Sequence, residues 1–295
     1  MDQAQQLRNI IKKQNQQRHL SRVITITSGK GGVGKSSISV NLAIQLSRLG
    51  KKVVILDADF GLANIEIMLG IRPQYSLLDV MKGRKSIKEV IIQGPENIGF
   101  ISGGSGIKEL TNLQADEVNS LLKTMYELDQ MADVVIVDTG AGISDTVMEL
   151  VMASSEVMLV TTPEPTSITD AYALLKTLNR IPEFSAKECQ IKMIGNRIST
   201  YEEGKELYEK LSTVVDKFLN IKLQYLGTIP YDEHIPKAIM KQQPVSISYP
   251  NAASARAMCE LAMVLGEIEE QQPKTRKGIA AMFAHVFKNR MKGKA

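Results

Sequence analysis

The sequence predicts an α/β fold in which helices cover both faces of a mostly parallel central sheet. The first observation is a short run rich in β-branched residues, "RVITITS" (22–28), which leads into a glycine-rich loop and then a helical pattern. The second is that apolar runs and helical patterns keep alternating along the chain. The third is that most of these runs are continuous rather than alternating, which is typical of strands buried on both faces. The 295 residues suffice for one large domain or two small ones.

Each predicted element has its own pattern. After the glycine loop, Ile38, Leu42 and Leu46 recur at helical spacing, and Gly50 is expected to end that helix. Continuous apolar runs predict the other strands at 53–59, 97–102, 133–140, 156–162, 191–197 and 223–230. Helical spacing predicts helices at 114–130, 144–153, 168–179, 201–219 and 252–270. Neither a repeat nor a break in composition divides 22–270, and the first linker pattern is at 269–278.

The composition excludes several classes. Apolar residues make up 43% and charged residues 23%, as in an ordinary globular protein. There is no apolar run of about 18 residues and no pattern typical of a signal peptide, so we expect neither a membrane span nor secretion. Cys189 and Cys259 stand far apart, which gives no metal or redox motif and fits a reducing cytosol.

The stretch "SGKGGVGKSS" (28–37) contains the pattern Gly-x4-Gly-Lys-Ser. Between a strand and a helix, its glycines let backbone N–H groups face phosphate oxygens, and the helix N-terminus favours an anion. We expect Lys35 to contact the β- and γ-phosphates and the Ser36 hydroxyl to ligate Mg²⁺. The predicted nucleotide-binding residues of the loop are Gly29, Lys30, Gly31, Gly32, Val33, Gly34, Lys35, Ser36 and Ser37. A chance loop of this composition is the alternative.

Three aspartates come at the ends of predicted strands. Asp57 and Asp59 end one apolar run and Asp138 ends another. Ligand groups gather at this edge of open α/β sheets, and a buried carboxylate there requires a cation or hydrogen bonds. Together with Ser36 they form the predicted Mg²⁺ site, and aspartates that only cap the following turns are the alternative.

The two ends of the chain are basic. Residues 1–22 carry a net charge of +4 and residues 274–295 carry +7, which leaves −7 for the rest of a chain whose total is +4. Basic arms on an acidic body usually meet an anionic or specific partner.

The C-terminal arm also has an apolar stripe at helical spacing. Next to its Lys and Arg residues, this stripe favours a helix that lies on a membrane surface. An ordinary last helix packed on the domain is one alternative, and nucleic-acid binding, which the Phe and Met residues disfavour, is another. The predicted membrane-facing residues are Ile279, Met282, Phe283, Val286 and Phe287.

These motifs resemble the MinD/ParA family of deviant-Walker ATPases. "KGGVGKSS", with its additional Lys30, resembles the family's signature phosphate loop, and "LDADFGLANIEIMLG" and "VVIVDTGAGIS" resemble its two switch segments. "TTPEPTSITDAYALLK", "GNRIS" and "LGTIPYDEHIPKAIMKQQPV" follow in the family's order, so the resemblance covers about residues 22–265.

The resemblance implies a slow ATPase that uses Mg²⁺ and dimerises face to face around ATP. Lys30 would reach the partner's phosphate, as an arginine finger does, and a Lys30 that is only solvated on the loop is the alternative. Asp59 would orient the attacking water or its Mg²⁺-linked network. Lys30, Lys35 and Asp59 are therefore the implied catalytic residues. Asn196 would recognise adenine, and the other residues implied at the base site are Arg197, Pro230 and Tyr231.

The N-terminal arm narrows the resemblance to the FlhG (YlxH) branch, which regulates flagellar number and placement. Its "DQAQQLR" resembles that branch's DQAxxLR motif, which stimulates the SRP-type GTPase FlhF, and implies Gln3, Leu7 and Arg8 as partner-binding residues. The branch also implies flagellar switch-complex proteins as partners and reversible attachment to the inner face of the cell membrane. The expected parts are an activator arm (1–21), an ATPase domain (22–270) and a linker with a membrane-targeting helix (271–295).

Other relatives fit less well. An iron–sulfur carrier would need a cluster of cysteines, a bacterial tyrosine kinase a tyrosine-rich tail, and an arsenite-pump ATPase a second phosphate loop. A division-site MinD and a DNA-segregating ParA remain as alternatives.

Overall fold

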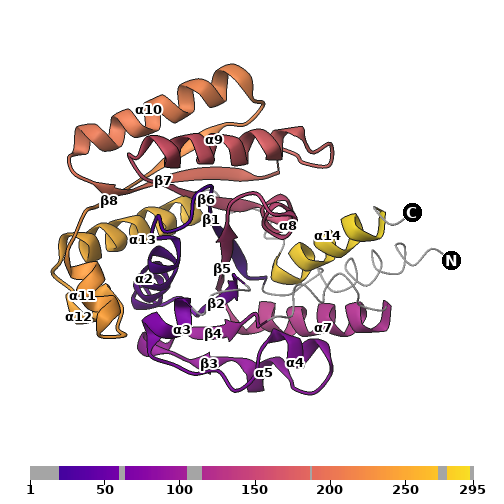
Figure 1. The fold of residues 1–295 in the computed structure, drawn as a ribbon. Helices are drawn as coiled ribbons and strands as arrows, with labels where there is room; N and C mark the ends of the chain where they lie inside the picture. Colours follow the sequence, from indigo (N-terminus) through magenta and orange to yellow (C-terminus); the bar gives the residue numbers. More distant parts are fainter. Residues whose placement is uncertain (1–19, 60–63, 105–114, 187, 272–277, 293–295) are drawn as a thin grey trace.

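The computed structural model describes residues 20–59, 64–104, 115–186, 188–271 and 278–292, and one eight-stranded sheet runs through them (Figure 1). The strands follow the order β3-β4-β2-β5-β1-β6-β7-β8. Neighbouring strands are parallel except for β3 and β4, which confirms the predicted fold class. The strands are β1 (Arg22–Ser28), β2 (Val53–Ala58), β3 (Ile92–Gln93), β4 (Gly99–Ser102), β5 (Val134–Ala141), β6 (Glu156–Thr161), β7 (Gln190–Ile198) and β8 (Leu223–Pro230).

Helices pack on both faces of this sheet. The long ones are α2 (Lys35–Arg48), α7 (Ala115–Met131), α8 (Asp145–Ala153), α9 (Pro165–Arg180), α10 (Tyr201–Phe218), α13 (Ala253–Gln271) and α14 (Gly278–Lys292). The short ones are α3 (Asn64–Leu69), α4 (Leu77–Met81), α5 (Ile87–Val90), α11 (His234–Met240), α12 (Val245–Ser248) and the 3₁₀ turn η1 (Pro95–Asn97). The sequence predicted the long helices and missed the short ones, because a helix of one or two turns shows too little periodicity.

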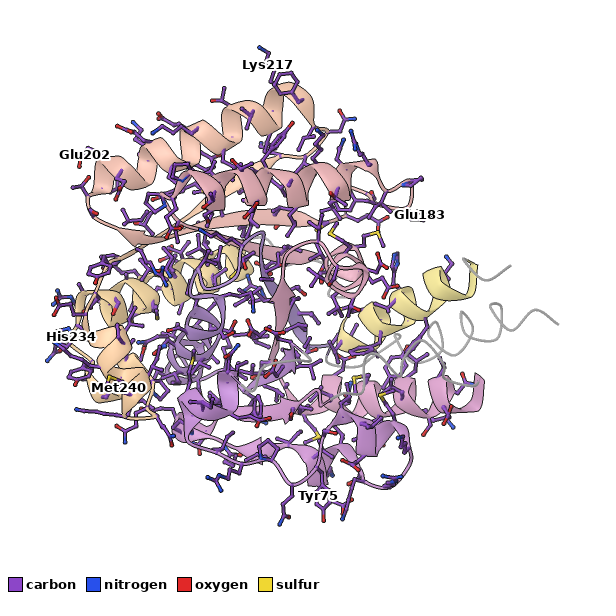
Figure 2. The ribbon with its side chains drawn as sticks, viewed as in Figure 1. Tyr75, Glu183, Glu202, Lys217, His234 and Met240 are labelled. Carbon is purple, nitrogen blue, oxygen red and sulfur yellow. The ribbon has the colours of Figure 1, made fainter. Side chains whose placement is uncertain are left out.

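The alternation of side chains along the strands divides the core. Ile24 and Ile26 of β1 point to one face, where α2 and α13 pack. Val135 and Val137 of β5 point to the other face, toward α7 and α14. On that face α8, α9 and α10 continue the layer over β6 to β8, and Figure 2 shows Glu202 and Lys217 near the two ends of α10, on its outer side. Since the strands are buried on both faces, their continuous apolar sequences are explained.

Helix α14 is docked on the protein body in this structure. It lies between α7 and α8 (Figure 1), and Ile279, Met282, Phe283, Val286 and Phe287 are 0–3% exposed. In this conformation the stripe that was expected to face lipid faces the protein core. An amphipathic pattern shows that one face of a helix is apolar, and it does not distinguish a protein groove from a lipid surface. No helix in the described part of the chain is both long and apolar enough to cross a bilayer.

The amino ends of the strands are joined by a buried ion cluster. Glu156, at the start of β6, accepts hydrogen bonds at 2.8 Å from Nε and Nη2 of Arg22. The ammonium of Lys192, which is 2% exposed, also contacts this carboxylate. Burial alone would raise the pKa of Glu156, but the bonds from Arg22 and the charge of Lys192 outweigh it and lower this pKa to about 2.

Candidate functional site

The phosphate loop joins β1 to α2 at the carboxyl edge of the sheet. Gly32 and Gly34 have φ of 76° and 94°, a region that favours glycine. A Cβ on Gly34 would lie 2.3 Å from Nδ2 of Asn196, and one on Gly29 would lie 2.2 Å from the backbone of Asp170. Gly32 is therefore required by its conformation, Gly29 by lack of space, and Gly34 by both.

The N-terminus of α2 fits a phosphate group. No side chain caps it, and its first turn contains no acidic residue. The backbone N–H groups there and the positive end of the helix dipole favour an anion. Together with the glycine turns this is the geometry that a nucleotide's phosphates require.

Asp138, at the carboxyl end of β5, gathers three side chains of α2. Its carboxylate accepts hydrogen bonds from Lys35 Nζ at 3.1 Å, Ser36 Oγ at 2.6 Å and Ser39 Oγ at 2.7 Å. The side chains of Lys35 and Asp138 are 7% and 1% exposed. The sequence predicted Lys35, Ser36 and Asp138 but missed Ser39, whose position one turn after Lys35 was the available signal.

Asp57 lies beside Asp138 on the neighbouring strand β2, since the two Cα positions are paired in the sheet. Its Oδ1 accepts a hydrogen bond from the backbone N–H of Asp59 at 2.9 Å. Burial raises the pKa of Asp57 to about 7, and the charges of Asp138 and Asp59 contribute to the rise. A carboxylate with so little compensating charge is a suitable neighbour for a cation.

The predicted metal residues therefore lie at the same edge of the sheet, but they do not form a complete set of metal ligands by themselves. Among the described residues, no three His, Cys, Asp or Glu side chains meet as ligands of one ion. Ser36 and Asp138 are in direct contact, and Oδ1 of Asp59 lies 3.4 Å from where a Cβ of Gly140 would be. This donor set of hydroxyl and carboxylate oxygens fits Mg²⁺, which commonly keeps waters and takes its other ligands from phosphates.

The predicted base-site residues lie on the other side of the loop. Asn196, 4% exposed, donates a hydrogen bond from Nδ2 to the carbonyl of Val33 at 2.7 Å. Arg197 has φ of 59° and donates from Nη2 to the carbonyl of Gly32 at 2.7 Å. Pro230 pairs with Ile198 on β7, and Tyr231 follows it with 65% exposure.

Lys30 has a different environment from Lys35. Its Nζ donates to Glu164 Oε2 at 2.6 Å and to Thr166 Oγ1 at 2.7 Å, at the start of α9. The side chains of Lys30 and Glu164 are 34% and 51% exposed, so this pair lies at the surface. Glu164 and Thr166 belong to the segment "TTPEPTS", which matches the family pattern, but the sequence indicated no role for either residue.

Three predicted partner-binding residues belong to the N-terminal arm. Gln3, Leu7 and Arg8 of the N-terminal arm lie outside the described residues. Residues 60–63, directly after Asp59, also lie outside the described residues.

The comparisons with known proteins agree with this geometry. A protein-family model described as "ParA: NUBPL iron-transfer P-loop NTPase" matches residues 19–265. The antiactivator FleN of Pseudomonas aeruginosa is 42% identical over 245 residues, which cover 83% of this chain and 86% of FleN. The flagellum site-determining protein YlxH of Helicobacter pylori is 32% identical over 273 residues, covering 91% of this chain and 90% of YlxH.

Among solved structures, the septum site-determining protein MinD of Pyrococcus horikoshii complexed with Mg-ADP superposes with a TM-score of 0.65. It is 25% identical, and the match covers 84% of this chain and 97% of that protein. The phosphate loop, the strand-end aspartates and these matches lead to one conclusion: the chain belongs to the ParA/MinD family of P-loop ATPases.

Proposed function

We propose that this protein is an ATP-dependent switch of the FlhG type, which dimerises around ATP, binds the membrane surface and regulates flagellar number or placement. The reaction is hydrolysis of ATP to ADP and phosphate. The different surroundings of the two loop lysines carry this proposal. Lys35 is buried against Asp138, whereas Lys30 lies at the surface, where a second copy could meet it.

Different residues of the site bind the phosphates, the Mg²⁺ ion, the attacking water and the adenine in this proposal. Lys35 and the backbone N–H groups of the loop hold the phosphates, and Ser36, Asp57 and Asp138 hold Mg²⁺. When bound, Mg²⁺ neutralises charge on the phosphate oxygens. Asp59 orients the attacking water. Asn196, kept in place by its bond to the loop, recognises adenine, with Arg197, Pro230 and Tyr231 beside it.

Lys30 acts on the partner's phosphate in this proposal. It must first leave Glu164 and Thr166 of its own chain, and exposed ion pairs of this kind contribute little to stability. A phosphate in a closed dimer interface attracts a cation more strongly than an exposed carboxylate does, because water is excluded there. Hydrolysis is then possible only when two copies meet.

The dependence on dimerisation is tested by measuring ATP hydrolysis at increasing protein concentration. The specific activity of the natural chain should rise with concentration and then level off. Lys30→Ala should keep ADP affinity within about threefold and lose the rise, whereas Lys35→Ala should lose ADP affinity by about 100-fold, or nearly 3 kcal/mol. A Lys30→Ala protein with unchanged activity would remove the proposed role across the dimer.

Membrane attachment requires α14 to leave its groove. Its apolar face is buried in this structure, so we propose that the docked helix is the unattached form and that the ATP dimer releases it. Two released helices on one dimer would bind together more tightly than one. Co-sedimentation with anionic vesicles should require ATP, and pelleting with DNA but not with vesicles would favour a ParA-like DNA function instead.

The N-terminal arm carries the proposed action on a GTPase. The match to the flagellum site-determining protein YlxH supports a flagellar role, and the arm's Gln3, Leu7 and Arg8 are the residues proposed to contact FlhF. A chain without residues 1–20 should lose stimulation of FlhF GTP hydrolysis while keeping its own ATPase. If stimulation persists, the activator lies elsewhere. Flagellar switch-complex proteins remain proposed partners on the same grounds.

The family description also mentions iron transfer, which the cysteines of this chain do not favour. Cys189 is buried beside β7, and Cys259 lies on α13. Neither belongs to a pair that could share a cluster.

A further inference from the structure

We infer that Ser39 is a positioning residue for the Mg²⁺ site, which keeps the Asp138 carboxylate in place when nucleotide binds. This inference rests on the proposed function. Asp138 accepts bonds from Lys35, Ser36 and Ser39, and the first two are the residues proposed to turn to phosphate and Mg²⁺. Of these three donors, only Ser39 has no other proposed task.

The geometry suits this role. Ser39 is 0% exposed and lies one helical turn after Lys35 on α2, on the side that faces β5. Its Oγ is 2.7 Å from Asp138 Oδ1 and 3.1 Å from the carbonyl of Lys35. The bond to the carboxylate is the shorter, and hydrogen bonds to charged acceptors are the stronger kind. A buried hydroxyl on a rigid helix can therefore fix the carboxylate's orientation.

The test measures ADP affinity of the full chain with and without Mg²⁺. Ser39→Ala should leave affinity in EDTA unchanged within about twofold and should reduce the gain on adding Mg²⁺ by about tenfold. In an Asp138→Ala background, Ser39→Ala should have no further effect on that gain. Ser47→Ala, at the exposed end of the same helix, is the matched control.

Two results would overturn the inference: an equal loss of affinity with and without Mg²⁺, which indicates a structural role, or no loss. If the natural chain binds no ADP at all, the proposed function fails, which is a different outcome.

A separate observation carries a second inference. We propose that Asp129 links Ser21, directly before β1, to the C-terminal helix, so that loss of either contact loosens the other. Asp129 lies on α7 and is 0% exposed. Its carboxylate accepts bonds from the backbone N–H groups of Ile279 at 2.8 Å and Ala280 at 3.2 Å, in the first turn of α14. It also accepts bonds from the N–H and hydroxyl of Ser21, directly before β1.

One carboxylate therefore caps the start of α14 and also holds Ser21 in front of β1. Gly278 is required here, because a Cβ would lie 2.5 Å from Asp129 Oδ2 and its φ is 73°. When α14 leaves, the Asp129 carboxylate loses two donors and the cover of the helix, so that water competes with Ser21 for it. When Ser21 leaves, the carboxylate is worse compensated, and docking of α14 weakens. Such coupling is reciprocal by linkage.

The test is amide hydrogen exchange of the full chain without nucleotide or membrane, so its outcome is independent of vesicle binding. Asp129→Ala should speed exchange across 279–287 by about tenfold to 100-fold. Ser21→Ala should speed the same amides by about fivefold, although it lies far away in sequence. Thr124→Ala, on the exposed side of α7, is the matched control.

If Ser21→Ala leaves exchange at 279–287 unchanged, Asp129 only caps the helix and the link is refuted. If Asp129→Ala also leaves exchange at 279–287 unchanged, the capping bonds of Asp129 do not stabilise α14.

Discussion

Two carboxylates at opposite edges of the same sheet differ in how their charge is compensated. Glu156, at the amino edge, is 7% exposed and has a pKa near 2, because Arg22 and Lys192 more than offset the effect of burial. Asp57, at the carboxyl edge, is 5% exposed and has a pKa near 7, because burial dominates. At the amino edge, the protein's own cations compensate the buried carboxylate. At the carboxyl edge the charge of Lys35 is too small a contribution to offset the burial of Asp57, which suits a site that receives a cation with its ligand.

The largest expected effect on stability comes from removing a cation at the amino edge of the sheet. Arg22→Met should lower the free energy of unfolding by about 3–5 kcal/mol, because it leaves Glu156 buried with less compensation. Urea unfolding at pH 7 measures this. Lys237→Met, in an exposed pair with Glu233, should change stability by less than about 0.5 kcal/mol. Equal effects would mean that the amino edge is not held by its ion cluster.

A substitution at the carboxyl edge should change the free energy of unfolding in the opposite direction. Asp57→Asn should stabilise the nucleotide-free protein by about 1–3 kcal/mol at pH 8, because it removes a buried charge that has few partners. The same urea measurement at pH 8 applies. Destabilisation of that size would show that Asp57 is compensated in the free protein.

The pH dependence sharpens the comparison. The pKa of Asp57 rises on folding from 3.8 to about 7, so the folded state binds more protons in this range, and its contribution to stability is lost as pH rises from about 4 to 7. The pKa of Glu156 falls from 4.5 to about 2, so its contribution is present above pH 4.5 and lost as pH falls toward 2. Unfolding of the natural chain across pH 2–8 should show both slopes, and Asp57→Asn should remove only the first.

Binding of Mg²⁺ with ADP should compensate the charge of Asp57 at the carboxyl edge. Since Mg²⁺ favours the ionised form of Asp57, the gain in ADP affinity on adding Mg²⁺ should rise with pH up to about 7, by up to about tenfold per unit. Calorimetric titrations at pH 6, 7 and 8 measure this gain. A gain independent of pH would place the cation away from Asp57.

The smallest effect is expected at the surface pair of Lys30 and Glu164. Glu164→Ala should leave the urea midpoint unchanged, because exposed pairs contribute little. It should lower the protein concentration needed for half-maximal ATP hydrolysis by about threefold, since Lys30 no longer has a competing carboxylate. A higher concentration requirement would mean that Glu164 assists the dimer.

That Lys35, Ser36, Asp57 and Asp138 come together could be predicted from the sequence, because half of this group lies in the phosphate loop. The glycines, Lys35 and Ser36 are adjacent in sequence, and Asp57 and Asp138 follow apolar runs whose parallel packing brings their ends together. The pairing of Lys30 with Glu164 could not be predicted, because it depends on how closely the start of α9 approaches the loop.

The C-terminal helix was harder for a physical reason. Its apolar stripe is real, but the residues that cover it come from α7 and α8, more than a hundred residues earlier. The same is true of Asp129, whose partners come from both ends of the chain. Contacts between distant segments leave no local pattern to recognise.

The molar mass of Asp59→Ala, measured by light scattering after size exclusion, tests the proposed switch most directly. With ATP and Mg²⁺ this variant should bind nucleotide without hydrolysing it and elute as a dimer of the 32.5 kDa chain, while with ADP it should elute as a monomer. The same molar mass with both nucleotides, whether monomer or dimer, would contradict the switch.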